Sequence, residues 1–566
     1  MIQLPKEHAK LVEQAIKAAQ AAGDLPVFDI PEIPIEAPKK PEFGDYACPV
    51  ALRLAKDAKM KPPQIAQEIA KHMPEAEFLG AVELAGPFMN FRLDETWLKH
   101  QVTNIITEGD GLFTLELGKG KKAQVEFVSA NPTGPLHIGR SRGAIVGDAT
   151  ARVLEAAGYD VQREYYFNNA GVQMQNLGQS LKTRYMEQLG RESEYEVTYK
   201  GDYLIEFAKE LVAEHSDGWA DKDWQPFKEY GEQRMFEMIR ATLDRVQIKH
   251  DAFFNENSVF DSGEVDTVSE KLKASGDMYE AVVWEGADEQ ETEKLKNGAP
   301  AWWFRSTKYG DDKDRVMIKG DGNATYTLPD FAYHMNKLNR GFDLAVNVLG
   351  SDHYVQAQVV QRGVTALGGD ANKIQVIFVQ IVHIVKDGET LKQSTRAGTF
   401  ETLDDLIDQT SEDAVRYLLL ARSPDSHLNF DVDAAVQQSN ENPVYYIQNA
   451  HVRCAGIFRE AEARGFSDEG EVDLSLLGEP EMRFLRKALE MGDTIEFAAQ
   501  TLEAHKIAFY AHELASIFHP VYEDVRVLHS EVPEDVAKAR LRFYRAAQVA
   551  LKRVLDLMGM SAPEVM

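Results

Sequence analysis

The chain has 566 residues, 44% of them hydrophobic and 27% charged, which excludes collagen, a disordered tail protein and a small disulfide-stapled domain. Its 62 Lys and Arg stand against 91 Asp and Glu, and the net charge of −29 means that nucleic acid can bind only where positive charge gathers locally. Two cysteines without a CxxC pair argue against a zinc site, and no stretch resembles a signal peptide or a membrane span. We expect a cytoplasmic multidomain enzyme with no membrane contact and no metal site.

Residues 1–112 are predicted to form a small α/β domain. Helical periodicity covers 14–22 and 51–71, and Pro62-Pro63 interrupts the second of these helices. A proline-rich connector lies between them, and residues 81–93 alternate like a strand.

The segment that follows predicts a strand, a helix and a second strand. The β-type run 123–129 precedes a turn-rich stretch, residues 141–157 have helical periodicity, and 161–167 form the next strand. A strand–helix–strand unit of this kind indicates a parallel sheet.

Three more elements complete the predicted sheet: strands at 344–349 and 374–379 and a helix over 355–366. The charged, helical residues from about 175 to 320 look like an insertion between sheet strands. We therefore predict a Rossmann-like catalytic domain over 113–410 that contains this insertion.

Residues 411–566 are predicted to form a C-terminal helical bundle. Helix breaks are expected near Pro424, Gly465–Gly470, Pro480 and Pro520, and the acidic run 467–473 is interpreted as a solvated loop. The predicted fold class is multidomain α/β plus all-α, with a Rossmann-like parallel-sheet core and its insertion between a small N-terminal α/β domain and the bundle.

The sequence PTGPLHIGRSR, residues 132–142, lies between the first predicted strand and its helix. A helix N-terminus behind a tight glycine turn offers unpaired N–H groups and a positive dipole end, which suit a phosphate. The His137 imidazole could donate a hydrogen bond to a phosphoryl oxygen, and Gly139 leaves room for an adenine ring. Taken alone, a histidine in a turn is more often structural.

Several motifs together resemble one family. His137-Ile138-Gly139-Arg140 resembles the HIGH signature of class I aminoacyl-tRNA synthetases, and its lead-in, residues 125–134, is similar to the form in arginyl-tRNA synthetases. The other motifs that resemble this family are GDYA at 44–47, YFNNAGVQ at 166–173, NPVYYIQNAH at 442–451 and MGMSAPE at 558–564. The resemblance covers nearly the whole chain, and it implies a catalytic role for Arg140. The ATP-binding residues that it implies are Pro132, Thr133, Gly134, His137 and Gly139.

A second constellation, Lys392-Gln393-Ser394-Thr395-Arg396, follows the last predicted parallel strand and resembles the KMSKS loop of the same class. The resemblance implies that Lys392 and Arg396 neutralise the charge that builds up on ATP phosphates as pyrophosphate leaves, while Ser394 supports the loop. Without the His137 motif upstream, a basic surface loop would be the better interpretation.

The chain departs from the signatures at three positions. Arg140 replaces the last His of HIGH, Thr395 replaces the second Lys of KMSKS, and Asn169 stands where the family often has Asp. In arginyl-tRNA synthetases without that second lysine, a lysine just before the HIGH-bearing strand is thought to replace it. Lys121 or Lys122 stands at that place, and we take Lys122 as the candidate.

A guanidinium is a planar cation, so its pocket calls for carboxylates and polar acceptors. Tyr326 and Asp330 are four residues apart, which places both on one face if this stretch is helical. The resemblance implies that these two contact the guanidinium, while Glu126 and Asn131 hold the α-amino and carboxyl ends of arginine. Asp352 or His353 is expected to add a contact. For Asp330 alone, complementation of the helix dipole is a fair alternative.

Residues 431–566 hold 14 Lys and Arg against 23 Asp and Glu, so tRNA binding there needs segregated charge. Lys538, Arg542, Arg545 and Lys552 share one face of the last predicted helix. A solvated face is an equal alternative on spacing alone, but the resemblance matches this region to the anticodon-binding domain. Tyr445 and Tyr446 could stack on unpaired bases or belong to the core.

The resemblance implies an arginyl-tRNA synthetase that uses L-arginine, ATP with Mg²⁺ and tRNA(Arg) and has no tightly bound cofactor. We expect a monomer. By the same resemblance, the N-terminal domain contacts the outer corner of tRNA and the insertion closes over its acceptor end. Two alternatives remain open: a class I synthetase for another amino acid, and a non-catalytic tRNA-binding relative.

Overall fold

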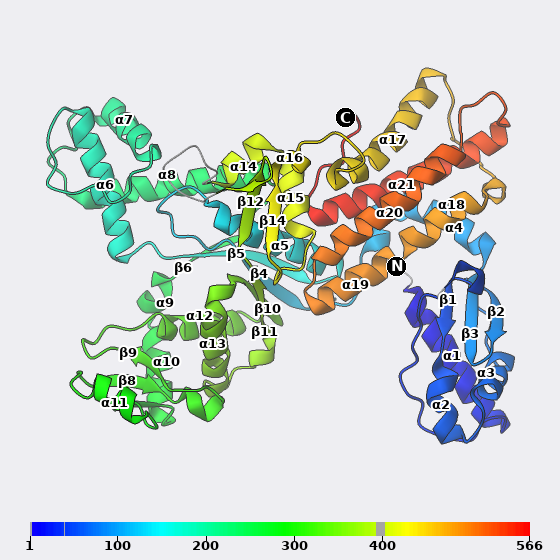
Figure 1. Cartoon of the computed structure of the whole chain (residues 1–566), viewed down its shortest axis with the longest axis horizontal. Helices are drawn as coiled ribbons and strands as arrows, with labels where there is room; N and C mark the ends of the chain where they lie inside the picture. Colours follow the sequence, from blue (N-terminus) through cyan, green and yellow to red (C-terminus); the bar gives the residue numbers. More distant parts are fainter. Residues whose placement is uncertain (1–2, 39, 392–401) are drawn as a thin grey trace.

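The computed structural model describes residues 3–38, 40–391 and 402–566. The N-terminal part forms a lobe of its own at one end of the molecule (Figure 1). Its elements are α1 Leu4–Ala22, β1 Tyr46–Cys48, α2 Val50–Ala58, α3 Pro62–Lys71, β2 Leu79–Ala85 and β3 Phe88–Leu93. The three strands form an antiparallel sheet in the order β1-β3-β2.

The lobe confirms the predicted small α/β fold and corrects two elements. α2 ends at Ala58 and α3 begins at Pro62, as the proline pair predicts. The predicted strand over 81–93 is a hairpin, because Gly86, with φ of +62°, turns the chain between β2 and β3. The next helix, α4 Glu95–Glu108, packs against the C-terminal helices instead of the lobe, although the predicted domain 1–112 includes it.

The central part is built on a five-stranded, all-parallel sheet in the order β11-β10-β4-β5-β6. Its strands are β4 Lys122–Glu126, β5 Asp160–Phe167, β6 Ala252–Asn255, β10 Leu344–Gly350 and β11 Ile374–Val379. The helices beside it are α5 Ile138–Ala156, α12 Thr327–Asn339 and α13 Tyr354–Ala366. The predicted parallel core is confirmed.

The two faces of the sheet differ in character. On one face α5 approaches so closely that a Cβ on Gly147 would lie 2.3 Å from the Phe127 ring. On the other face α12 lies over buried polar side chains, and Lys337 on this helix pairs with Glu126. The buried polar side chains on this second face continue to the carboxyl edge of the sheet.

The predicted insertion is divided in two by a strand of the sheet. α6 Gly171–Gln188, α7 Tyr203–His215 and α8 Trp224–Arg245 form a helical module with its own apolar core. β6 then pairs in parallel with β5. The second module contains α9 Asn257–Asp261, α10 Glu264–Ala274, α11 Glu289–Leu295 and an antiparallel sheet of β7 Met278–Ala281, β8 Ala301–Phe304 and β9 Arg315–Ile318. The two modules project from the same end of the molecule (Figure 1).

The chain after the sheet is mainly helical. A small sheet of β12 Val382–Lys386, β13 Glu389–Thr390 and β14 Leu428–Asp431 comes first, with α14 Leu403–Gln409, α15 Glu412–Leu420 and α16 Val432–Ala435. The bundle consists of α17 Pro443–Ala463, α18 Glu479–Leu489, α19 Met491–Thr501, α20 His505–Asp524 and α21 Glu534–Met558. β14 corrects the all-helical expectation, and Pro520 lies inside α20 instead of breaking it.

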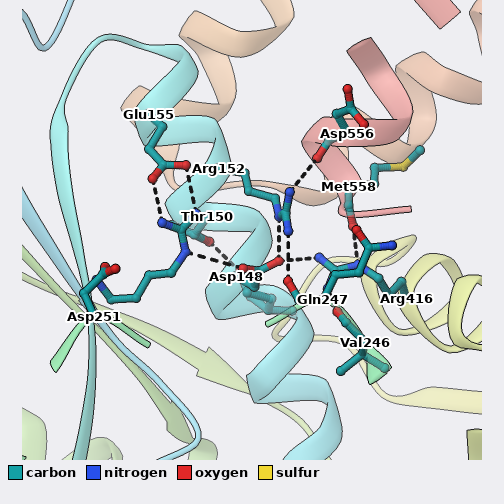
Figure 2. A network of polar contacts seen from close by, with 12 residues as sticks. Asp148, Thr150, Arg152, Glu155, Val246, Gln247, Asp251, Arg416, Asp556 and Met558 are labelled. Carbon is teal, nitrogen blue, oxygen red and sulfur yellow. Dashed lines mark hydrogen bonds and ion pairs between the residues drawn. The ribbon is translucent and has the colours of Figure 1, made fainter. Parts of the chain in front are cut away.

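A buried ionic network fixes the bundle to α5 (Figure 2). Asp148, in the middle of α5, pairs with Arg416 of α15 and with Arg152, and the Asp148 and Arg416 side chains are both essentially unexposed. Arg416 also donates to the carbonyl of Met558 at the end of α21. Gly559 has φ of +67°, and a Cβ there would lie 2.0 Å from Arg416, so only glycine fits.

Two motifs of the sequence serve as joints. Asp45, of the GDYA motif, accepts from the Leu93 amide and pairs with Arg486 of α18, at 2.8 Å, which ties the N-terminal lobe to the bundle. On α17, Gln448 donates to Ser561 and the His451 ring bonds the carbonyl of Pro563, so this motif holds the C-terminal tail.

Candidate active site

A cavity of about 800 Å³ opens where β4, β5 and β10 end, the edge at which open parallel sheets bind ligands. Polar groups reach it from the segments after β4 and β5, from the start of α12 and from the start of α13. The polar residues that line it include Glu126, Ser129, Asn131, Arg140, Asn168, Gln173, Glu256, Tyr326, Asp330, His334, Asn347, His353 and Gln356. Glu126, Asn131, Tyr326, Asp330 and His353, which the sequence nominates for arginine, thus share one cavity.

His137 is the N-cap of α5, and its ring is oriented by the helix it caps. The Gly139 amide donates to His137 Nδ1 at 2.9 Å, so the proton of the neutral ring is on Nε2. The ring is exposed, and Nε2–H is therefore available to donate to an oxygen outside. The first amides of α5 add further donors and a positive dipole end.

The turn before His137 is held by a residue that the sequence did not nominate. Tyr203 of α7 donates its hydroxyl proton to the carbonyl oxygen of Thr133 at 2.8 Å. Pro132 in this turn is buried, while Thr133 and Gly134 are half-buried. The first helical module therefore braces the predicted ATP-binding turn.

The predicted lysine substitute does not reach this edge. Lys122 is the first residue of β4, and its amide donates to Asp343 at the start of β10. Glu126 lies four residues further, about 13 Å along the strand, at the edge that carries the cavity. Lys121 precedes Lys122 at the same amino edge, and the catalytic role of Lys122 stays a prediction that its place in the sheet does not support. Lys392, Ser394 and Arg396 lie outside the described residues.

Tyr326 and Asp330 both line the cavity from the start of α12, as their four-residue spacing predicts. Tyr326 is the N-cap of α12 with a side chain that is 79% exposed, and Asp330 lies in the first turn, where it accepts from Gln356 Nε2 at 2.8 Å. Burial raises the pKa of Asp330 to about 7; the charges of Glu126 and Glu256 add to the rise, and the Gln356 hydrogen bond opposes it. Asp330 is half-buried by its exposed surface, and a cationic ligand in the cavity would stabilise its ionised form.

Glu256 is the functional candidate that sequence reasoning missed. It lines the cavity and accepts from the Tyr166 hydroxyl and from Asn168 Nδ2, each at 2.9 Å. Neither Glu256 nor Asp330 forms an ion pair with any described residue. The signal in the sequence is an acid directly after a strand, but β6 has only four residues, too few for a periodic pattern to indicate a strand.

The other nominated contacts have different outcomes. Asn131 accepts from the Asn168 amide at 3.0 Å and donates to Gln173 at 2.9 Å, so its amide is fixed at the mouth of the cavity. Of the pair Asp352 and His353, only His353 lines the cavity, while the Asp352 side chain is 82% exposed. The structure therefore favours His353, and the contact of Asp352 with arginine stays a prediction.

Asn169, where the family often has Asp, makes contacts with protein side chains. It donates to Glu232 of α8 at 2.8 Å and accepts from Asn255 and Asn257 on either side of Glu256. Asn169 therefore connects the first module to the segment that carries Glu256.

The predicted cationic face of α21 is largely neutralised within the bundle. Arg542 and Arg545 both pair with Asp468, whose side chain is only 3% exposed. Lys538 pairs with Glu534 at 2.6 Å, and Lys552 lies 3.7 Å from Asp556. Arg542 and Arg545 share this one carboxylate, and their tRNA-binding role stays a prediction. The solvated-loop interpretation of 467–473 is corrected, because the segment contains a buried, ion-paired Asp.

The two tyrosines of α17 are half-buried. The Tyr446 ring packs against His519, with ring centroids 4.3 Å apart, which supports a packing role. Tyr445 remains a candidate for base stacking.

The start of α5, whose sequence resembles the HIGH signature, lies at the carboxyl edge of a parallel sheet that also carries the cavity, which is the arrangement of class I aminoacyl-tRNA synthetases. Three family models match the chain. The model described as "tRNA synthetases class I (R), catalytic domain" matches residues 101–442. The models described as "Arginyl tRNA synthetase N terminal domain" and "DALR anticodon binding domain" match residues 6–93 and 447–566. The chain is 41% identical to the arginine–tRNA ligase 1 of Halalkalibacterium halodurans and 39% identical to the arginine–tRNA ligase of Bacillus subtilis. Each match extends over 565 residues and covers 98% of this chain and 98% of the relative. The chain belongs to the arginyl-tRNA synthetase family.

A solved structure supports the fold. The arginyl-tRNA synthetase of Thermus thermophilus superimposes with a TM-score of 0.74 at 21% identity, over 99% of this chain and all of that chain. Within the described residues, no helix combines the length and apolarity needed to cross a membrane.

Proposed function

We propose that the protein activates L-arginine with ATP to form arginyl-adenylate and then transfers the arginyl group to the 3′ end of tRNA(Arg). The single observation that carries the choice of arginine is the pair of carboxylates, Asp330 and Glu256, which face one cavity without a cationic partner among the described residues. A guanidinium supplies the missing charge and forms charge-assisted hydrogen bonds to both carboxylates.

The first step is an in-line displacement at phosphorus. A carboxylate oxygen of arginine attacks the α-phosphorus of ATP, and the bond to the β-phosphate oxygen breaks as pyrophosphate leaves. Mg²⁺ enters with ATP as part of the substrate. His137 Nε2–H, Arg140 and the first amides of α5 stabilise the negative charge of the transition state, and no protein nucleophile is required.

By resemblance, we assign Lys392, Ser394 and Arg396 to the same step. Their proposed role is to bind the leaving pyrophosphate. The second step is attack of the terminal ribose hydroxyl of tRNA on the adenylate carbonyl, which releases AMP.

Arginine is proposed to lie with its guanidinium between Asp330 and Glu256 and its α-carbon end near Glu126 and Asn131. Tyr326, at the exposed side of the cavity, is proposed to contact the guanidinium together with Asp330. His353 provides a polar contact at the α13 side.

For tRNA we propose the division of labour that the family resemblance implies. Residues 1–112 contact its outer corner, the modules within 113–410 approach the acceptor end, and 411–566 bind the anticodon arm. Lys538, Lys552 and Tyr445 remain candidates within that last part. We further propose that the protein acts as a cytoplasmic monomer.

The test is aminoacylation of purified tRNA with each of the twenty standard amino acids in turn. We expect charging with arginine alone and none with lysine, because an ammonium cannot satisfy two separated carboxylates as a planar guanidinium does. Charging with an apolar amino acid would contradict the assignment of the cavity, and charging with none would contradict the enzymatic activity.

A further inference from the structure

One buried cation lies directly behind the arginine cavity. The Lys337 side chain is fully buried, and its Nζ lies 2.6 Å from Glu126 Oε2 and 2.5 Å from Asn347 Oδ1. The third direction of the ammonium faces the Tyr333 ring, whose centroid is 4.4 Å away. Glu126 and Asn347 line the cavity and Lys337 does not, so Lys337 can act on a ligand only through them.

The contacts of Lys337 extend to the start of α12. Asn347 accepts from Lys337 and donates its amide to His334 Nε2 at 2.8 Å, and His334 Nδ1 bonds the carbonyl of Asp330 at 2.8 Å. Burial and the Lys337 charge lower the pKa of His334 to about 3, so the ring is neutral and donates from Nδ1. Each group in this series therefore donates a hydrogen bond to the next, from the Lys337 ammonium through Asn347 and His334 to the carbonyl oxygen of Asp330.

The cavity therefore has two ends with different net charge. At the inner end the Glu126 carboxylate is balanced by Lys337, while at the other end Asp330 and Glu256 have no balancing cation among the described residues. Arginine has the matching asymmetry. Its α-carbon end holds an ammonium and a carboxylate that cancel, whereas its guanidinium end carries a full positive charge.

We propose that Lys337 is a positioning residue that fixes Glu126 and cancels its charge, so that arginine binds in one orientation with its zwitterionic end toward Glu126. This inference rests on the proposed function of the cavity. Without Lys337, Glu126 would attract any isolated ammonium, and a ligand with two cationic ends would gain relative to arginine.

Agmatine, which is arginine without its carboxylate, is the probe for this difference. The measured quantity is the Ki of agmatine against arginine-dependent pyrophosphate exchange, divided by the KM of arginine. Four proteins change the charge next to the α-carbon end in steps: Glu126→Gln makes it positive, the wild type and the double variant E126Q/K337M leave it neutral, and Lys337→Met makes it negative. We expect the ratio to rise about tenfold in E126Q, fall about tenfold in K337M and return near the wild-type value in the double variant.

Lys182 provides a matched control. It is also a buried lysine, paired with Glu194 at 2.7 Å and lying 5.2 Å from the Tyr195 ring, but it belongs to α6. Lys182→Met should leave the ratio unchanged even if it lowers stability. If K337M does not fold, E126Q and the double variant still give the ordering, because replacing both members of a buried pair is often tolerated.

A ratio that is the same in all four proteins, with arginine and agmatine weakened in parallel, would overturn the proposal and leave Lys337 a structural residue. That outcome leaves the proposed function intact, since the wild type still activates arginine. Absence of arginine-dependent exchange in the wild type would instead overturn the proposed function.

Discussion

At the scale of single residues, we propose a different role for each of two residues: His137 acts on the phosphate and Asp330 on the guanidinium. Sequence spacing predicted both, because a histidine in a strand-to-helix turn and an acid one turn after a tyrosine are local patterns. It could not predict Glu256, Lys337 or the buried state of Asp468, because these depend on which segments the fold brings together. Asp468 is part of an acidic run in the sequence, but in the bundle Arg542 and Arg545 enclose it.

His137→Ala should lower the rate of adenylate formation by about 10²–10³, the usual effect of removing one transition-state donor. The KM of arginine should hardly change, because the ring does not line the arginine cavity. Pyrophosphate exchange measured in the presence of tRNA checks this. Wild-type exchange by the folded variant would show that the ring serves only to cap α5.

If arginine binds at Asp330 as proposed, the raised pKa of this carboxyl should make the binding pH-dependent. Since the folded pKa is about 7 and the ordinary value is 3.8, the carboxyl is protonated in the empty cavity below about pH 7, and the KM of arginine should rise as the pH falls through this point. The same shift means that the empty protein loses stability as the pH rises from about 4 to about 7, where the unfolded chain has already lost the proton.

Asp330→Asn should remove both effects. We expect a KM for arginine that is raised about 10–100-fold at pH 8 and no longer depends on this titration. The free energy of unfolding of the empty variant should exceed that of the wild type at pH 8 by up to about 4 kcal/mol, with a smaller excess at pH 5. Denaturant unfolding at the two pH values measures it, and equal differences at both would contradict the assignment.

At the scale of elements, long apolar strands were predictable and short ones were not. β10 and β11 are mainly apolar runs, and β4 and β5 combine β-branched or aromatic residues with a turn-rich neighbour. In contrast, β6 and β14 have four residues each and gain their strand character from their neighbours. Pro520 does not end α20, because tertiary packing of the apolar face overrides local propensity. The two modules likewise act through contacts that no local pattern contains, such as that of Tyr203 with Thr133.

Tyr203→Phe tests that contact. Loss of one hydrogen bond to the turn before His137 should change kcat/KM for ATP by about 2–10-fold without changing the KM of arginine. Tyr195→Phe in the same module is the matched control, because its hydroxyl donates to Asp223 at 2.6 Å, in a contact that involves no residue of this turn. Steady-state kinetics with varied ATP distinguishes them, and equal effects of the two variants would mean that Tyr203 only stabilises its module.

Reversal of Arg542 and Arg545 to Glu should destabilise the bundle. Asp468 would then be buried among like charges, and breaking a buried pair costs about 3–5 kcal/mol. Lys538→Glu is the control, since its partner Glu534 is exposed and such a pair contributes about 0.3–0.5 kcal/mol. Denaturant unfolding should show a much larger loss of unfolding free energy in the double reversal than in Lys538→Glu. A small loss in the double reversal would contradict the structural role and favour phosphate binding by these arginines.

At the scale of the whole molecule, the domains are connected by a few buried polar joints. The Asp148–Arg416 network fixes the bundle to the helix that begins next to His137, and the Asp45–Arg486 pair fixes the N-terminal lobe to the same bundle. Of the residues in these two pairs, Asp45 belongs to a motif remote from the cavity, and its contacts give that motif a structural role. The molecule has a net charge of −29, so its acidic domains repel one another, and these joints hold the domains in defined positions.

The central claim is that Asp330 and Glu256 together select arginine, and the most direct test is the arginine dependence of pyrophosphate exchange in the variant E256Q/D330N. Two neutral amides keep the shape of the cavity and remove the charge that a guanidinium requires. The account predicts that the KM of arginine rises at least about 100-fold while the KM of ATP stays within about twofold of wild type. An unchanged KM for arginine in the folded variant would contradict it, because the guanidinium would then bind elsewhere.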